Sequence, residues 1–189
     1  MSTTTTTDPL VHLSAALDGA AAVVDGVGPD RWDRPTPCAG WDVGAVVTHL
    51  RDGTWWFAGT LGGPPPGGDA DARPGAVLRA ANAALLAAFS RDGALDEAVS
   101  VPFGDVPGIV ALHLRATEAL VHGWDVAVAT GQDLVVDDAV AAEALAFSEV
   151  ALGMLPPDRS PFAPPVPVAD DAPALVRLVA LLGRDPDRA

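Results

Sequence analysis

The chain has 189 residues, a length that fits one domain with a sizeable hydrophobic core. Hydrophobic residues make up 49% of it and charged residues 19%, which excludes the composition of a disordered chain. The 25 acidic residues against 11 basic ones give a formal net charge of -14, and such a surface repels phosphate backbones and anionic lipids, so neither nucleic acid nor a membrane is an expected partner.

The N-terminal end and the cysteine content indicate where the protein works. Residues 1–7 are polar and threonine-rich, without the basic and apolar regions of a signal peptide, and we expect them to form a disordered tail. No apolar run reaches the roughly 18 residues of a transmembrane helix. Cys38 is the only cysteine, which excludes an intrachain disulfide and a cysteine-rich zinc site. The sequence therefore predicts a single cytoplasmic domain over residues 8–189.

Three helices are expected in the first half of the chain. The first begins at Asp8 and Pro9, which are typical N-cap and first-turn residues, and ends near Gly26. Prolines and glycines interrupt residues 32–40, and the second helix is expected from Trp41 or Asp42 to about Gly59. The glycine- and proline-rich residues 62–72 predict a surface loop, followed by a third helix from about Pro74 to Ser90.

The second half contains the longest predicted helix. Val99, Val101 and Phe103 alternate with other residues, which indicates a short extended segment or a tight turn. The long helix follows from about Pro107 to Thr130, because Gly131 is a typical C-terminal stop.

A fifth helix is expected from Asp137 or Asp138 to Gly153. A proline-dense extended crossing over residues 156–173 and a last short helix from about Ala174 to Leu182 complete the chain. Four long helices with additions predict an all-α helical bundle, a fold that places metal and cofactor sites between facing helices.

Glu118 and His122 form the strongest candidate for a metal-binding pair. At about 100° per residue they lie about 40° apart on one helix face, one turn from each other. His113 lies about 180° around the same helix from His122, so it is excluded from their site. Two histidines with one carboxylate are a recurring catalytic zinc set. His49, in the middle of the second helix and flanked by apolar residues, is the natural third ligand, and His12 is the reserve.

An alternative without metal fits the same residues. A core histidine bonded to a buried acid, such as Glu118, would also satisfy polar groups on these helices. Around this site, Asp125 can orient a histidine or bond locally, and Arg115 can pair with Glu118 or meet an anionic substrate, although a solvated arginine is the simpler interpretation. Trp55 and Trp124 can line the pocket mouth or pack in the core.

Two stretches of the sequence resemble a known family. Residues 31–50, RWDRPTPCAGWDVGAVVTHL, are similar to the W..PTPC.GW.V..L..HL signature of the DinB-like, mycothiol-dependent maleylpyruvate isomerase superfamily. Residues 118–131, EALVHGWDVAVATG, are similar to its E..VHGWDLA.ATG motif. Residues 162–186, with PVPVADDAP and LLGRDP, resemble the end of an actinobacterial branch.

The resemblance implies a DinB-like up-and-down four-helix bundle, with a short additional C-terminal helix and extended segments, that holds a divalent metal, most often zinc, on His49, Glu118 and His122. It also implies mycothiol or another small thiol as the co-substrate of an isomerisation or thiol transfer. The leading hypothesis is therefore a metal-dependent transferase or isomerase that delivers a thiol to a small electrophilic substrate. The native metal, the substrate and dimer formation through an apolar helix face stay open.

Two further hypotheses stay open at this point. A metal-dependent hydrolase, isomerase or cyclase could use the same ligands without a thiol, and non-haem iron fits the same donor set. A protein that binds a metal or a small molecule without turning it over would carry the same three residues.

Overall fold

The computed structural model describes residues 8–64, 72–101, 104–154, 160 and 162–188. Its elements in chain order are α1 (Pro9–Asp25), α2 (Val43–Thr60), α3 (Pro74–Phe89), β1 (Ala98–Val101), β2 (Gly104–Pro107), α4 (Gly108–Thr130), α5 (Asp138–Gly153), α6 (Ala174–Leu181) and the 3-10 turn η2 (Pro186–Arg188). The predicted tail 1–7, most of the loop 62–72, Phe103 and part of the crossing 156–173 lie outside the described residues. The predicted all-α fold is confirmed.

The helix ends follow from local capping residues. Asp8 accepts a hydrogen bond from the Leu10 amide at 3.0 Å at the start of α1, and Asp42 accepts one from the Ala45 amide at 2.7 Å at the start of α2. At the end of α4, Gly131 adopts a left-handed conformation with φ of 65°, which a residue with a side chain rarely tolerates. These signals are local in the sequence, and for that reason the predicted helix ends lie within a few residues of the observed ones.

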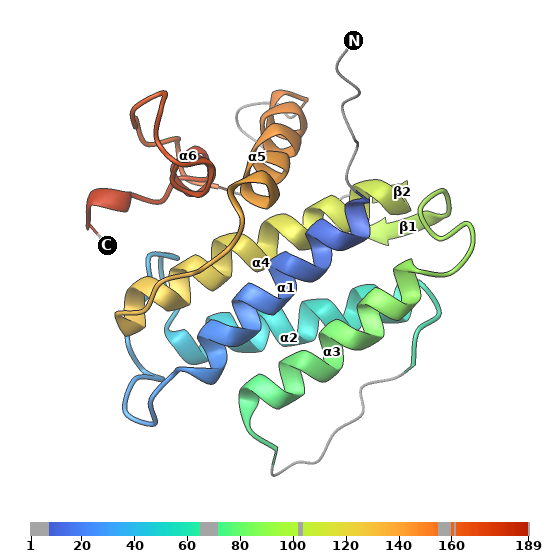
Figure 1. Ribbon diagram of the computed structural model, residues 1–189, viewed down its shortest axis with the longest axis horizontal. Helices are drawn as coiled ribbons and strands as arrows, with labels where there is room; N and C mark the ends of the chain where they lie inside the picture. The colour runs from blue at the N-terminus through green and yellow to red at the C-terminus, as the bar shows by residue number, and fades with distance from the viewer. Residues whose placement is uncertain (1–7, 65–71, 102–103, 155–159, 161, 189) are drawn as a thin grey trace.

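Helices α1 to α4 form the bundle (Figure 1). α1 packs against α3 and α4, and α2 packs against the same two helices, so α1 and α2 occupy diagonal positions. α1 and α4 run in one direction, while α2 and α3 run in the other. β1 and β2 pair in an antiparallel hairpin between α3 and α4, with Val99 opposite Val106. The start of α2 consequently faces the second half of α4.

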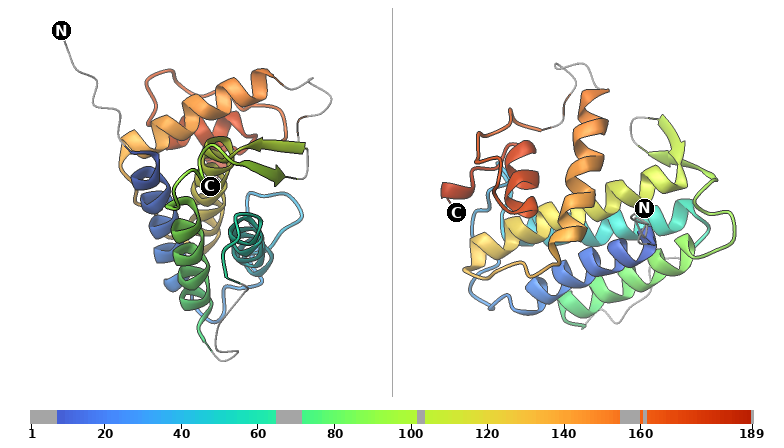
Figure 2. Two further views of the ribbon diagram at one scale, coloured as in Figure 1. Left: turned by 90° about the vertical axis from the view of Figure 1, so that its right-hand side faces the viewer. Right: turned by 45° about the horizontal axis from the view of Figure 1, so that its top comes forward.

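Helices α5 and α6 pack on each other and lie on one side of the bundle, over α4 and α1 (Figure 2). α5 has 16 residues, as many as α3, yet it is not part of the four-helix bundle. The C-terminal addition is therefore a pair of helices whose contacts with α4 bring the end of the chain to the bundle core.

The crossing of α1 and α4 requires a small residue at Gly123. A Cβ atom at this position would lie 3.2 Å from the Cα atom of Ala20 and 3.5 Å from Leu134 Cδ1. The two backbones can therefore approach closely only because Gly123 has no side chain. The buried core contains many small and branched apolar residues, among them the fully buried Leu13 and Leu120.

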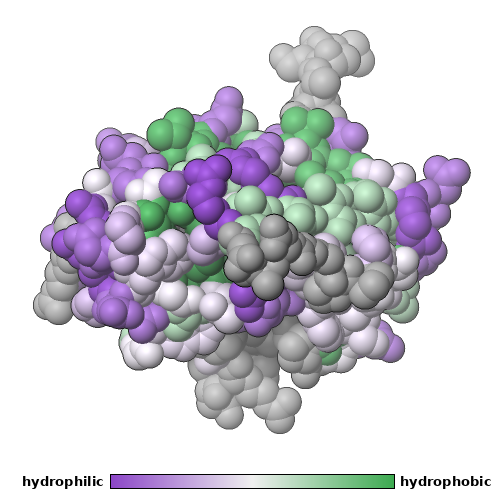
Figure 3. Space-filling model, turned by 90° about the horizontal axis from the view of Figure 1, so that it is seen from below, coloured by the Kyte–Doolittle hydropathy of each residue, from purple (hydrophilic) through white to green (hydrophobic). Residues whose placement is uncertain are grey.

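The outer surface is more polar. Figure 3 shows one face, on which hydrophilic side chains gather at both ends and recur between them, beside weakly hydrophobic ones and a few strongly hydrophobic groups along one edge. The exposed large apolar side chains of the described residues are Val11, Trp56, Val135, Val150 and Met154, of which Val150 and Met154 lie one turn apart at the end of α5. None of the described helices has both the length and the hydropathy that a bilayer crossing requires.

Substitution of Gly123 tests the close crossing. We expect Gly123→Val to lower the free energy of unfolding by about 1–3 kcal/mol, because the added methyl groups overpack the contact with Ala20. Gly59→Val is the matched control in α2, where an added Cβ meets nothing within 4 Å. Urea denaturation of both variants measures the difference, and equal stabilities would contradict the proposed packing constraint.

Candidate metal centre

His49 and His122 face each other between α2 and α4. Their ring centroids lie 5.1 Å apart with the rings nearly perpendicular, at 79°. Glu118 lies one turn before His122 on α4, and its Oε2 atom is 3.7 Å from His49 Nε2. The structure therefore brings these three residues together, and we call His49, Glu118 and His122 the bundle triad.

The triad is partly open to solvent. The side chains of His49 and Glu118 are each 37% exposed to solvent, whereas that of His122 is 12% exposed. Burial lowers the pKa of His49, while the negative charge of Glu118 acts in the opposite direction. The His49 imidazole is consequently in its neutral form at neutral pH, which is the form that binds metal ions.

Trp41 forms one wall beside both histidines. Its ring lies edge-on to His49 at 4.8 Å between centroids and is nearly parallel to His122, at 6.0 Å and 8°. A tight loop before α2 places it there, in which the Thr36 hydroxyl and amide both donate to the Trp41 carbonyl, at 2.9 and 3.0 Å. Gly40 permits this loop because its φ is 81°.

Arg115 lies beneath Glu118 and is almost completely buried, with a side-chain exposure of 1%. Its guanidinium donates to Glu118 Oε2, and it also donates to Thr54 Oγ1 at 3.1 Å. The lack of a side chain at Gly53 makes room for it, since a Cβ there would lie 2.9 Å from Arg115 Nη1. The simpler sequence interpretation, a solvated surface arginine, is wrong, because the facing helix α2 covers this position.

Asp125 holds His122 from the other side. Its Oδ2 atom lies 3.0 Å from His122 Nδ1, and its side chain is fully buried. Arg184 donates to both carboxylate oxygens, from Nη2 to Oδ2 at 2.9 Å and from Nε to Oδ1 at 3.3 Å. A carboxylate bonded to Nδ1 favours the tautomer that leaves Nε2 free to accept or to bind a metal ion.

Arg184 was not among the site residues that the sequence identified. It lies 59 positions from Asp125, and only its place in the LLGRDP motif marks it in the sequence. Its Nη1 atom donates to the Leu182 carbonyl at 2.9 Å, which holds the side chain toward the bundle.

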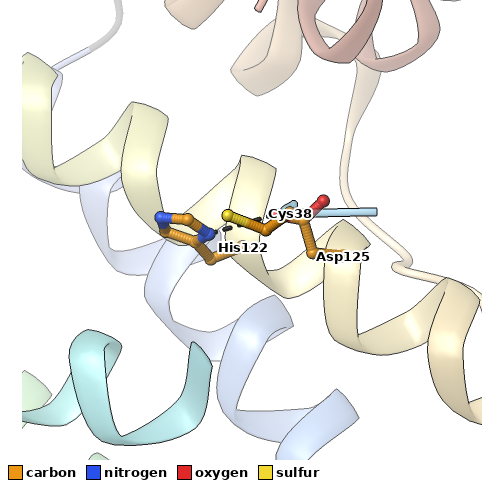
Figure 4. Close-up of side chains that lie close together, drawn as sticks. All are labelled: Cys38, His122 and Asp125. Atoms are coloured by element: carbon orange, nitrogen blue, oxygen red, sulfur yellow. Dashed lines mark hydrogen bonds and ion pairs between the residues drawn. The ribbon is translucent and has the colours of Figure 1, made fainter. Parts of the chain in front are cut away.

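Cys38 also lies beside His122 (Figure 4). Potential ligand atoms of Cys38, His122 and Asp125 all lie within 4.8 Å of one another, so a second metal-ligand set shares His122 with the bundle triad. Burial raises the pKa of the Cys38 thiol; Arg184 lowers it and Asp125 raises it by smaller amounts. Both oxygens of Asp125 already accept hydrogen bonds, which makes this carboxylate a weaker candidate ligand than Glu118.

The two tryptophans predicted near the pocket, Trp55 and Trp124, have no ring contact with the triad histidines among the contacts of the described residues. Trp55 is half-buried and packs against the hydrophobic core. Trp124 lines a separate pocket of about 470 Å³ between the end of α4 and α6, together with Gln132 and Leu175. The tryptophan whose ring contacts the triad histidines, among the ring contacts of the described residues, is Trp41.

The other two histidines lie away from the triad. His12, the reserve ligand, contacts Glu143 of α5, and His113 lies 3.4 Å from the same carboxylate. The exclusion of His113 from the site by helical geometry agrees with this position.

Comparison with known proteins places the chain among related sequences. A sequence profile described as the mycothiol maleylpyruvate isomerase N-terminal domain matches residues 13–127. An uncharacterized protein of Mycobacterium tuberculosis, in strains CDC 1551 / Oshkosh and H37Rv, is 35% identical over 187 residues, which cover 94% of this chain and 98% of that protein. The residues matched by the profile include the triad and Asp125, but not Arg184.

Solved structures show the same fold. The crystal structures of the mycothiol-dependent maleylpyruvate isomerase and of one of its histidine-to-alanine mutants each match with a TM-score of 0.57. The sequence identity is 15%, and the match covers 75% of this chain and 68% of the isomerase chain.

The buried ion pair of Arg184 and Asp125 can be tested by stability. We expect Arg184→Gln to lower the free energy of unfolding by about 3–5 kcal/mol, because Asp125 is then left as a buried charge without its partner. Arg177→Gln on α6 removes an arginine whose pair with Glu149 is solvent-exposed, and it should cost less than about 1 kcal/mol. Urea denaturation measures both, and similar losses in the two variants would show that the buried pair is not important for stability.

Proposed function

Because the chain belongs to the mycothiol maleylpyruvate isomerase family, we propose that it is a metal-dependent transferase or isomerase. In this proposal the metal is a divalent ion, most simply zinc, and the co-substrate is a low-molecular-weight thiol such as mycothiol. The thiol attacks a small electrophilic substrate. The observation that carries the proposal is the convergence of His49 with Glu118 and His122 from two facing helices.

The residue types of the triad suit a zinc ion, although its donor atoms do not all lie within 4.8 Å of one another in this structure, as those of Cys38, His122 and Asp125 do. Two imidazoles and one carboxylate form a recurring catalytic zinc set, in which one position stays open for water or substrate. With metal-ligand bonds of about 2.0–2.2 Å, adjacent ligands of a tetrahedral ion lie about 3.3 Å apart. The 3.7 Å between His49 Nε2 and Glu118 Oε2 is close to this separation. The hydrogen bond from His122 Nδ1 to a carboxylate is the usual second contact of a metal-binding histidine.

The residues around the triad give each ligand a fixed orientation. Arg115 holds Glu118 from below and reduces the negative charge of the site, while Asp125 sets the tautomer of His122. Trp41 covers the two imidazoles on one side and leaves the partly exposed edge at His49 and Glu118 as the direction of access. Bound there, zinc would supply a position at which an incoming thiol loses its proton at neutral pH.

The state of Cys38 supports the use of an external thiol. Because burial raises its pKa, the Cys38 side chain is a protonated thiol at neutral pH and a weak nucleophile. Cys38 is also the only cysteine of the chain, so a thiolate reagent has to come from solution.

The first experiment compares zinc retention after reconstitution and desalting. We expect His49→Ala and Glu118→Gln each to lose about one zinc ion per chain relative to the wild type, because each removes a triad ligand. Glu97→Gln is the control, since Glu97 lies between α3 and β1, is exposed and pairs with Arg91. Elemental analysis of folded protein, checked by circular dichroism, gives the ratio.

A Cys38→Ser variant separates the two possible ligand sets. Retention of the ion in Cys38→Ser and its loss in Glu118→Gln support the triad. The reverse result would place the ion at Cys38, His122 and Asp125 and would contradict the triad.

The thiol is tested with cobalt in place of zinc. We expect mycothiol to produce a sulfur-to-cobalt charge-transfer absorption band in the wild type and not in His49→Ala, because the thiol sulfur binds at the open position. An analogue with a hydroxyl in place of the thiol is the control ligand. If electrophilic substrates are converted equally well without any thiol, the thiol-dependent mechanism is wrong and the metal-dependent hydrolase or isomerase hypothesis replaces it.

A further inference from the structure

A second group of metal-binding side chains lies where α1, α4 and α5 meet. His12 from α1 contacts Glu143 of α5 through Nδ1 and Oε2, and His113 from α4 faces the other carboxylate oxygen, with 3.4 Å between Nδ1 and Oε1. We call His12, His113 and Glu143 the three-helix cluster. It contains the same residue types as the bundle triad, and the two groups together use all four histidines of the chain.

The three-helix cluster is distinct from the bundle triad. His113 precedes His122 by nine residues on α4, which corresponds to about 13 Å along the helix axis, and it points to a different face. Only His113 of the three residues falls within the stretch matched by the family profile. The cluster is therefore a feature that the family assignment does not explain.

The surroundings of Glu143 leave its negative charge incompletely balanced. Its side chain is 30% exposed, and the ion pairs found for it among the described residues are with the two imidazoles, not with an arginine. The side chains of His12 and His113 are more deeply buried, at 12% and 19% exposure. Burial lowers the pKa of His113, which keeps this imidazole neutral at neutral pH.

We propose that His12, His113 and Glu143 bind a second divalent cation of the zinc type. The 3.4 Å between His113 Nδ1 and Glu143 Oε1 matches the separation of about 3.3 Å between adjacent ligands of tetrahedral zinc. The donor atoms of the three residues do not all lie within 4.8 Å of one another in this structure, and His12 Nδ1 is in direct contact with Oε2, so the His12 side chain has to rotate to admit the ion. The exposed edge of Glu143 leaves room for a water molecule as the fourth ligand.

The position of the cluster assigns it a structural role. Its ligands come from two bundle helices and from α5, the first helix of the C-terminal addition, so a bound ion joins that addition to the bundle. Phe147, one turn after Glu143 on α5, stacks on His113 with 5.1 Å between centroids, which restricts rotation of this imidazole. A bound cation therefore stabilises the docking of α5, and through it the packing of α6.

The proposal is independent of metal binding at the triad, and the experiment keeps the two apart. His49→Ala combined with His122→Asn removes ligands from the triad and from the Cys38 set, while the asparagine retains a hydrogen-bond donor for Asp125. We expect this double variant to bind one zinc ion per chain by equilibrium dialysis and to gain thermal stability when zinc is added, because the cation binds only the folded state.

Further substitutions in this background identify the ligands. Glu143→Gln should weaken zinc binding at least tenfold and abolish the zinc-dependent increase in Tm, and His113→Asn should do the same. Glu149→Gln, on the exposed side of α5, is the matched control and should leave both unchanged. Circular dichroism without metal shows whether each protein is folded, and the isosteric glutamine keeps the shape of the Glu143 side chain.

Two results would overturn the proposal. A folded double variant that binds no zinc would show that the three-helix cluster is held by hydrogen bonds alone. Zinc binding that survives both Glu143→Gln and His113→Asn would place the ion elsewhere. In either case zinc binding at the triad of the wild-type protein is unaffected, so the two proposals fail separately.

Discussion

The buried carboxylate of Asp125 is the interaction on which the arrangement of the molecule depends. A fully buried charge is tolerated only with a well-placed partner, and Arg184 supplies two hydrogen bonds to it from near the C-terminal end of the chain. The same carboxylate bonds His122 Nδ1 and so sets the free nitrogen of that ring. One ion pair thus connects the folding of the C-terminal segment to the geometry of the candidate metal centre.

Helix α4 organises much of the structure because it contacts α1 and α2 in the bundle and both helices of the C-terminal pair. It contacts α1 through a glycine, α2 through the triad and Arg115, and α5 and α6 on its remaining side. Its positions 118 and 122 share a face, whereas position 113 points toward α1 and α5. One helix can therefore contribute ligands to two separate groups, since nine residues carry the side chain about half a turn around the axis.

The family relationship and the C-terminal addition contribute different parts of the candidate site. The stretch matched by the family profile contains His49, Glu118 and His122. Arg184 and Glu143 lie outside this stretch. Arg184 nevertheless holds Asp125 in place by hydrogen bonds, and Glu143 connects α5 to α1 through its contact with His12. The mycobacterial relative matches across nearly its whole length, so the C-terminal part is shared within this narrower group. The addition consequently belongs to the structural unit that holds the site.

The sequence by itself determined the helices and the three residues of the triad. Capping residues such as Asp8 and Asp42, helical spacing, and the two motifs act over a few positions, and for that reason they can be recognised without a structure. The environment of each residue was decided only by tertiary structure. Arg115 is buried because α2 covers it, and Glu143 meets two histidines because α5 folds back onto α1 and α4. Such contacts join residues far apart in the chain, and local patterns contain no information about which faces will meet.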